Sequence, residues 1–210
     1  MTTFVFVRHG ENDLIRTRVA GRQNGVHLNE QGQKQAQKIA NALSPFPIDA
    51  IYSGPLERAC ETAAPLCERL HLPLQIAKEF NEIDFGDWTN ASFTDLAKMP
   101  EWQPWNSFRS FAATPNGEMM IGVQARVLHK MRELRRLHRL LVVFSHGDVI
   151  RATMAYFLGT PLDLFLRITI DSASINVIEV GDDFSRVRLV NGNVSAADIL
   201  PELALQDWLA

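Results

Sequence analysis

The apolar residues of the chain fall into short runs that are separated by helical patterns. Residues 3–8 and 140–145 form largely apolar runs of the kind found in buried strands, and shorter strand patterns occur at 48–53 and 73–77. Residues 28–44 instead repeat apolar side chains at the i, i+3, i+4, i+7 spacing of a helix. Strands that alternate with helices predict an α/β fold, and we expect a three-layer α/β/α sandwich around a mostly parallel sheet.

Residues with known preferences for helix ends mark the boundaries of these elements. Asn29 is expected to cap the helix at 28–44, because its side chain can accept a hydrogen bond from a free backbone N–H. Pro55 is expected at the first position of a second helix, over 54–70. The remaining expected elements are a helix at 148–158 and two strands near 174–180 and 185–190.

The segment from about 80 to 120 follows neither period and is rich in aromatic residues. We interpret residues 85–120 as an inserted helical lid within a single domain that spans residues 1–210. The large side chains of the lid are interpreted mainly as packing residues, with substrate contact as the alternative. They are Trp88, Phe93, Trp102, Trp105 and Phe108.

Composition narrows the class of protein. The 210 residues are 46% hydrophobic and 21% charged, as in a soluble globular protein that can bury a sizeable core. The two cysteines, Cys60 and Cys67, lie about two helical turns apart, which is too far for a disulfide, and two are too few for a zinc site. Without an apolar span of about 20 residues or a charged leader, the chain is expected to be cytoplasmic.

The net charge of −3 conceals a basic stretch at 126–139, which holds six Lys or Arg and one Glu. A nucleic acid or an acidic membrane could bind such a stretch. However, Val127, Met131 and Leu134 form an apolar stripe, so we interpret the basic residues as the solvated face of a helix. Aromatic residues are not interleaved with the basic ones, and we expect neither nucleic acid nor membrane as a partner.

Two strand ends carry the same dipeptide, which points to shared chemistry. The run "FVFVRHGEN" at 4–12 ends on His9-Gly10, and "LLVVFSHGDVIR" at 140–151 ends on His146-Gly147. Ligands of open α/β sheets bind beyond the carboxyl ends of the strands. Glycine there lets the backbone approach a ligand, and the helix that follows Gly147 offers free N–H groups to an anion.

Arginines accompany the histidines at this edge. Arg8 precedes His9, and Arg58 lies in the first turn of the helix after the strand at 48–53. Each residue alone has an ordinary structural explanation, such as packing for a histidine or a surface ion pair for Arg58. Their convergence, with Glu82 in a loop near the same edge, predicts a phosphate site rather than a metal site.

These residues belong to motifs that resemble the histidine phosphatase superfamily, also called phosphoglycerate-mutase-like, over nearly the whole chain. The motifs are "RHGE" at 8–11, "AGRQNGVHLNEQGQKQA" at 20–36, "IYSGPLERACETA" at 51–63, "EIDFGDW" at 82–88, "PNGE" at 115–118 and "SHGDVIRA" at 145–152. The resemblance implies that His9 is a nucleophile that becomes phosphorylated. It further implies that Arg8, Arg58 and His146 grip the phosphoryl group, that Glu82 donates a proton, and that no metal or other cofactor is needed.

The resemblance also has departures. Many members of the family carry an asparagine six residues after the nucleophile, where this chain has Ile15. Asn12, Arg16 and Thr17 are candidate replacements in contacting the phosphate. Additional substrate-side candidates are Gly21, Arg22 and Gly147.

Three functions follow as alternatives. The first is a metal-independent phosphomonoesterase of the phosphatase branch, acting on a small phosphorylated metabolite that the sequence does not identify. The second is a phosphoglycerate mutase, although 89–117 contains only Lys98 and Arg109 as cations to clamp a carboxylate. The third, from another class, is a non-catalytic module that binds phosphate or a phosphoprotein. The apolar residues 199–210 could pack on the body or on a second subunit, so a homodimer is possible.

Overall fold

The computed structural model describes residues 1–193, in which six strands form one mixed sheet with the order β3-β2-β4-β1-β5-β6. The strands are β1 (Thr2–Arg8), β2 (Ala50–Ser53), β3 (Leu74–Ile76), β4 (Leu140–Ser145), β5 (Ile175–Val180) and β6 (Ser185–Gly192). The pairs β3-β2, β2-β4 and β4-β1 are parallel, whereas β5 runs antiparallel to β1 and β6 antiparallel to β5. The predicted α/β fold is therefore confirmed, with an antiparallel hairpin added at one edge.

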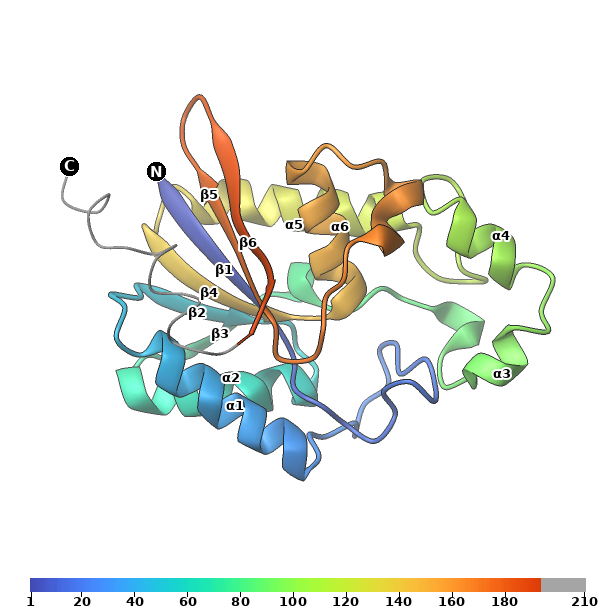
Figure 1. Ribbon diagram of the computed structural model, residues 1–210, viewed down its shortest axis with the longest axis horizontal. Helices are drawn as coiled ribbons and strands as arrows, with labels where there is room; N and C mark the ends of the chain where they lie inside the picture. Colours follow the sequence, from blue (N-terminus) through green and yellow to red (C-terminus); the bar gives the residue numbers. More distant parts are fainter. Residues whose placement is uncertain (194–210) are drawn as a thin grey trace.

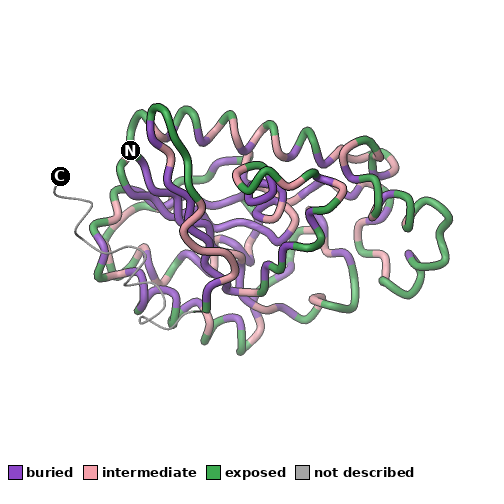
Figure 2. The backbone as a smooth tube through the Cα atoms, turned by 45° about the horizontal axis from the view of Figure 1, so that its top comes forward, coloured by how far each residue is buried: buried purple, intermediate pink, exposed green. Residues whose placement is uncertain are grey.

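Helices cover both faces of this sheet (Figure 1). Helices α1 (Glu30–Leu43) and α2 (Glu57–Leu70) lie on one face, and α5 (Met120–Leu134) and α6 (Gly147–Phe157) lie on the other. Side chains of β1 alternate between the two cores: Val5 and Val7 pack with α1 and α2, whereas Phe4 and Phe6 pack with α5 and α6. The central strands are buried along their length, as the purple traces of Figure 2 show.

The helix ends agree with the sequence in one case and differ in another. Asn29 caps α1 as predicted, because its Oδ1 accepts a hydrogen bond of 2.9 Å from the Gly32 N–H. The prediction for Pro55 is wrong, since α2 begins two residues later, at Glu57. The reason is that Gly54 still pairs with β4 through the Phe144 carbonyl, at 3.1 Å, so the chain turns later.

The expected lid consists of short helical turns joined by loops. They are η2 (Gly86–Trp88), α3 (Phe93–Leu96) and α4 (Trp102–Ser107). Two further 3-10 helices lie outside the expected lid: η1 (Lys78–Phe80) follows β3, and η3 (Leu162–Arg167) follows α6. The indoles of Trp88, Trp102 and Trp105 pack together with ring centroids 5.3–5.4 Å apart, so the predicted packing role holds for these three. Helices α3 and α4 lie at the end of the molecule opposite the N-terminus (Figure 1).

Two further expectations from the sequence concern membrane-spanning helices and the C-terminal segment. Within residues 1–193, no helix combines the length and the apolar character that a membrane crossing requires. The apolar segment 199–210, for which packing on the body or on a second subunit was considered, lies outside the described residues.

Candidate active site

The two His-Gly strand ends meet at the carboxyl edge of the sheet. Strands β1 and β4 are neighbours, with Arg8 paired with Ser145 in register, and the His9 N–H donates to the Ser145 carbonyl at 3.0 Å. This pairing brings the rings of His9 and His146 to a centroid distance of 5.2 Å. The parallel ladder therefore dictates how the two histidines lie relative to each other.

The ring of His9 is held in one orientation. It is 4% exposed, and its Nδ1 lies 2.8 Å from the Gly10 carbonyl oxygen. Because a carbonyl only accepts, Nδ1 carries the proton and Nε2 keeps a free lone pair. Burial, followed by the charges of Arg58 and Arg8, lowers the pKa of His9 well below its ordinary value, so the ring is neutral at pH 7. A neutral, oriented imidazole is what a nucleophile requires.

Unpaired nitrogen atoms of three side chains surround His9. Arg58 is 1% exposed; its Nη2 donates to the Gly21 carbonyl at 2.8 Å, while its Nε and Nη1 have no protein partner. Arg8 donates through Nη1 to the Ile170 carbonyl, and its Nε is unpaired. Both ring nitrogens of the fully buried His146 are also unpaired. Donors of this kind suit an oxyanion.

Glycine at position 147 has a steric reason. A Cβ atom there would come within 3.2 Å of Cζ and Nε of Arg8. The guanidinium therefore packs directly over the start of α6, where backbone N–H groups are free. His146 precedes this helix, and burial together with Arg58 and His9 lowers the pKa of its ring well below the ordinary value. His146 is consequently a neutral group in the free protein.

Glu82 reaches the same edge from the loop that follows β3. Its Oε1 accepts from the Ile83 N–H at 2.9 Å, and its Oε2 lies 3.9 Å from Nδ1 of His146. Burial, followed by the negative charge of Asp148, raises the pKa of Glu82 to about 7. A carboxyl group with this pKa can both donate and accept a proton near neutral pH.

An open cleft of about 290 Å³ gives access to these groups. Its lining includes seven residues that were predicted from the sequence as site residues: Arg8, His9, Asn12, Gly21, Arg58, Glu82 and Gly147. The lid contributes a wall of Phe85, Phe93, Trp102, Trp105, Asn106 and Arg109. His146 lies behind this surface, in contact with His9. No group of three or more His, Cys, Asp and Glu side chains within residues 1–193 could hold a metal ion.

The loop after His9 is the region where the chain departs from the family pattern. Ile15 lines the cleft, and so do two of the candidate replacements, Asn12 and Arg16. Asn12 is buried, and its Oδ1 accepts from the Leu14 N–H at 3.0 Å. Thr17, the third candidate, is exposed outside the lining and donates its hydroxyl to the Leu14 carbonyl.

Sequence reasoning missed a charged cluster on the far wall of the cleft. Asp148 forms ion pairs with Arg109, at 3.1 Å, and with Arg151, and Arg109 lies over the indole of Trp105, at 3.2 Å from the ring centroid. Burial acts to raise the pKa of Asp148, but the two arginines outweigh it and hold the pKa below its usual value. The signal was the i, i+3 spacing of Asp148 and Arg151 in the first turns of α6.

Two arginines lie elsewhere than expected. Arg22, nominated for the substrate side, is absent from the cleft lining; its Nε donates to the Glu82 carbonyl at 2.9 Å. Arg126 was assigned to a solvated face, but it bonds to carbonyls of the 79–82 loop and its side chain is only 18% exposed. The helix that carries it, α5, also begins and ends earlier than the basic stretch. Neither arginine could be assigned from helical periodicity alone.

Comparison with known proteins gives a consistent identification. The family description "Histidine phosphatase superfamily (branch 1)" matches residues 4–193. Phosphoserine phosphatase 1 of Hydrogenobacter thermophilus is 32% identical over 192 residues, covering 86% of this chain and 87% of that protein. Adenosylcobalamin/alpha-ribazole phosphatase of Escherichia coli K12 is 28% identical, covering 88% and 93%.

Solved structures agree with these relatives. A mycobacterial glucosyl-3-phosphoglycerate phosphatase in complex with VO3 superposes with a TM-score of 0.83 at 26% identity, covering 92% of this chain and all of that one. The sheet, the covering helices and the sequence motifs at its carboxyl edge thus lead to one assignment. The chain belongs to branch 1 of the histidine phosphatase superfamily.

Proposed function

We propose that the protein is a metal-independent phosphomonoesterase that hydrolyses a small phosphorylated metabolite through a phosphorylated His9. The observation that carries the proposal is the state of the His9 ring: neutral, buried, and fixed by the Gly10 carbonyl so that Nε2 is free. The named relatives of this chain are phosphatases, which supports hydrolysis as the overall reaction.

In the first step, Nε2 of His9 forms a bond to phosphorus as the bond from phosphorus to the ester oxygen breaks. Negative charge on the phosphoryl oxygens is stabilised by the free N–H groups of Arg8 and Arg58 and by a ring N–H of His146. Arginine donors have a planar fork that matches the geometry of phosphoryl oxygens. These groups therefore do the work that metal ions do in other phosphoryl-transfer enzymes.

Glu82 balances the protons of the two steps. Protonated at the start, it gives its proton to the departing alkoxide and becomes a carboxylate. In the second step it takes a proton from water as the water oxygen bonds to phosphorus and the bond from phosphorus to Nε2 breaks. The pKa of about 7 makes both directions accessible near neutral pH. His9 and Glu82 are then restored for the next turnover.

The surroundings of the cleft favour the phosphatase over the two alternatives. Lys98 pairs with Asp95 at the surface, and Arg109 pairs with Asp148, so both cations of the segment 89–117, where a mutase would carry its carboxylate clamp, are engaged. A binding module needs neither a nucleophile nor a proton donor. We further propose a cytoplasmic location for this activity; a reducing compartment fits the free thiols of Cys60 and Cys67.

The proposal is tested by trapping the covalent intermediate. The protein is mixed with a phosphomonoester labelled on phosphorus, in excess EDTA, and quenched within the first turnover. We expect one labelled group per chain, stable in base and labile in acid, and inhibition by vanadate. His9→Ala should abolish the label, whereas His27→Ala, at an exposed histidine, should keep it. Activity that is lost in EDTA and restored by a divalent cation, or a label that survives in His9→Ala, would disprove the mechanism.

A further inference from the structure

Glu82 lies in a segment whose position no strand ladder determines. It falls between the two 3-10 turns η1 and η2, after β3 has ended. Its backbone is nevertheless bonded on both sides: its N–H donates to Oδ1 of Asn81 at 2.8 Å, and its carbonyl accepts from Arg22 Nε at 2.9 Å and Arg126 Nη2 at 3.2 Å. Side chains from distant parts of the chain therefore hold the Glu82 backbone in place, whereas backbone hydrogen bonds of the sheet hold His9.

Arg126 holds more than one peptide of this loop. Besides the Glu82 carbonyl, its Nη2 donates to the Asn81 carbonyl at 2.8 Å, and its Nη1 donates to the Glu79 carbonyl. A guanidinium is suited to this because its donors point in fixed directions within one plane. Arg126 thus fastens the loop to α5, the helix packed on that face of the sheet.

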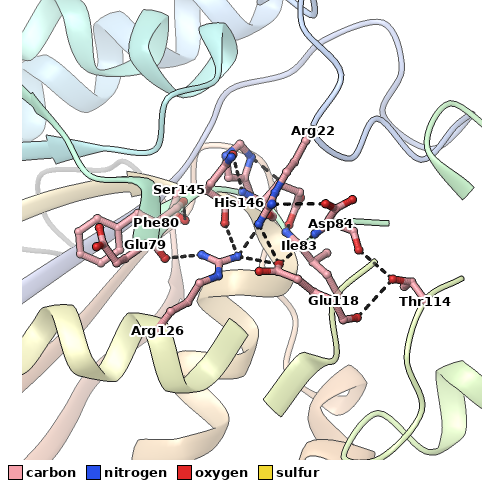
Figure 3. A network of polar contacts seen from close by, with 12 residues as sticks. Arg22, Glu79, Phe80, Ile83, Asp84, Thr114, Glu118, Arg126, Ser145 and His146 are labelled. Carbon is pink, nitrogen blue, oxygen red and sulfur yellow. Dashed lines mark hydrogen bonds and ion pairs between the residues drawn. The ribbon is translucent and has the colours of Figure 1, made fainter. Parts of the chain in front are cut away.

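Glu118 brings the two arginines together. Its Oε2 accepts from Arg22 Nη2 at 2.9 Å, from Arg126 Nη2 at 3.3 Å and from the Asp84 N–H at 3.0 Å. Figure 3 shows Arg22 and Arg126 converging on this carboxylate from opposite sides. Without its charge, two guanidinium groups would stand close together beside one carbonyl and repel each other. The carboxylate therefore keeps both donors aimed at Glu82.

Two glycines allow Glu118 to come this close. The Glu118 N–H donates to the Asp84 carbonyl at 2.9 Å, which joins the turn at 114–118 to the loop after Glu82. A Cβ on Gly117 would lie 2.3 Å from the Asp84 carbonyl oxygen, and one on Gly86 would lie 1.9 Å from the Pro115 carbonyl oxygen. The "PNGE" motif therefore builds a close backbone contact and presents a carboxylate from it.

We propose that Glu118, Arg22 and Arg126 form a clamp of positioning residues that holds the Glu82 carboxyl in the place where it transfers its proton. The inference rests on the proposed role of Glu82 as the proton donor. With the Glu82 peptide clamped and Oε1 bound to the Ile83 N–H, the remaining oxygen, Oε2, has little freedom beside His146. Proton transfer depends steeply on this geometry, and a displacement of about 1 Å can cost about 10²-fold in rate.

Two substitutions separate geometry from charge. Glu118→Gln keeps the shape of the side chain but removes its charge, so the two arginines lose the negative charge that they share. Arg126→Lys keeps the charge but removes the fork that spans the carbonyls of the loop. The single-turnover rate of His9 phosphorylation and its half-saturating substrate concentration are measured by rapid quench for an alkyl phosphate, whose leaving group needs a proton, and for an aryl phosphate, whose leaving group does not. The inhibition constant of vanadate reports the phosphate site separately.

The expected result is a loss confined to the proton-dependent substrate. Both variants should lower the phosphorylation rate with the alkyl ester by about 10-fold or more, with the half-saturating concentration, the aryl phosphorylation rate and vanadate inhibition within about 2-fold of the parent. Glu133→Gln is the matched control: the same change at an exposed carboxylate that pairs with Lys130, and it should have no effect. If Glu118→Gln does not fold, Arg22→Gln tests the same clamp, because the Arg22 side chain is 32% exposed.

The outcomes distinguish failure of the clamp from failure of the proposed function. If the parent forms phosphohistidine and Glu82→Gln is selective for alkyl esters, but both clamp variants match the parent, the clamp is disproved alone. An equal loss on both esters with weaker vanadate inhibition would also disprove it, since the residues would then merely support the fold. If Glu82→Gln itself shows no selectivity for the leaving group, the role of Glu82 fails first.

Discussion

The two halves of the candidate site are positioned by different physical means. His9 and His146 end adjacent parallel strands, so backbone hydrogen bonds of the ladder dictate their separation. Glu82 instead lies in a loop that is held by side chains of Arg22 and Arg126, contributed from far along the sequence. The phosphate half is therefore part of the core, and the proton-donor half is attached to it. Substitutions should affect substrate binding and chemistry differently in the two halves.

The largest effect is expected in the phosphate half, from His9→Ala. Turnover should fall by at least about 10⁴-fold, because loss of a nucleophile removes the covalent route altogether. Phosphate binding should change little, since Arg8, Arg58 and His146 remain. Single-turnover kinetics and calorimetric titration with inorganic phosphate measure the two quantities. Arg58→Ala is the comparison variant and should weaken turnover and phosphate binding together; near-parental turnover in His9→Ala would contradict the scheme.

This half of the site was largely predictable from the sequence. Apolar runs that stop at Arg8-His9-Gly10 and at His146-Gly147 identify strand ends, and parallel strands bring their carboxyl ends to one edge. Arg58 was predictable because the first turn of a helix after a parallel strand lies at the same edge. Local pattern and sheet geometry suffice where the ladder does the positioning.

The other half was predictable only in part. Glu82 was identified by resemblance, since its loop has no period from which a direction could be inferred. Arg22 was assigned to the substrate side and Arg126 to a solvated face, although both bond to the Glu82 loop. Hydrogen bonds from these side chains to a backbone carbonyl 60 and 44 residues away depend on tertiary packing, and a single sequence carries no local signal of them.

Glu82→Gln should produce the next largest effect, and one that depends on the substrate. Alkyl esters should react about 10²–10⁴-fold more slowly, the usual contribution of a general acid, while aryl esters should be nearly unaffected. The comparison is made by rapid quench while phosphorylation of His9 limits the rate. An equal loss on both classes would make Glu82 a positioning residue, and His146 would be the next candidate for the proton donor.

The raised pKa of Glu82 also predicts how the rate of phosphorylation changes with pH. Because the pKa of Glu82 is raised to about 7, the group is protonated below this pH and loses its proton above it. The rate of phosphorylation by alkyl esters should therefore fall as pH rises through about 7, and Glu82→Gln should remove this limb. Aryl esters serve as the control and should lack it in the parent as well.

A smaller effect is expected from Gly86→Ala, which disturbs the close backbone contact between the loop after Glu82 and the turn at 114–118. Gly86 has a φ of +53°, and a Cβ there would lie 1.9 Å from the Pro115 carbonyl, so the turn at 114–118 must move. We expect a loss of about 1–3 kcal/mol in the free energy of unfolding, measured by denaturant titration. Alkyl turnover should fall by about 10-fold. Gly122→Ala is the control, because a Cβ there would have no neighbouring atom within 4 Å; equal stability of the two variants would contradict the close contact.

The smallest effect is expected from Arg16, which lines the cleft but belongs to neither half of the site. Arg16 is exposed, lines the cleft, and makes no hydrogen bond or ion pair with the described residues. Its backbone is in the left-handed region, with a φ of +68°, which is uncommon for a residue other than glycine. A substrate with a second anionic group would gain binding free energy from the positive charge of Arg16, but only modestly, because exposed ion pairs contribute about 0–1 kcal/mol.

Arg16→Gln should thus raise KM about 2- to 5-fold for phosphomonoesters that carry a carboxylate, and leave KM unchanged for alkyl phosphates without a second charged group. Added salt should reduce the difference, since it screens exposed charges. Equal KM changes for both substrate classes would show that Arg16 acts on the conformation of the loop rather than on the second anion.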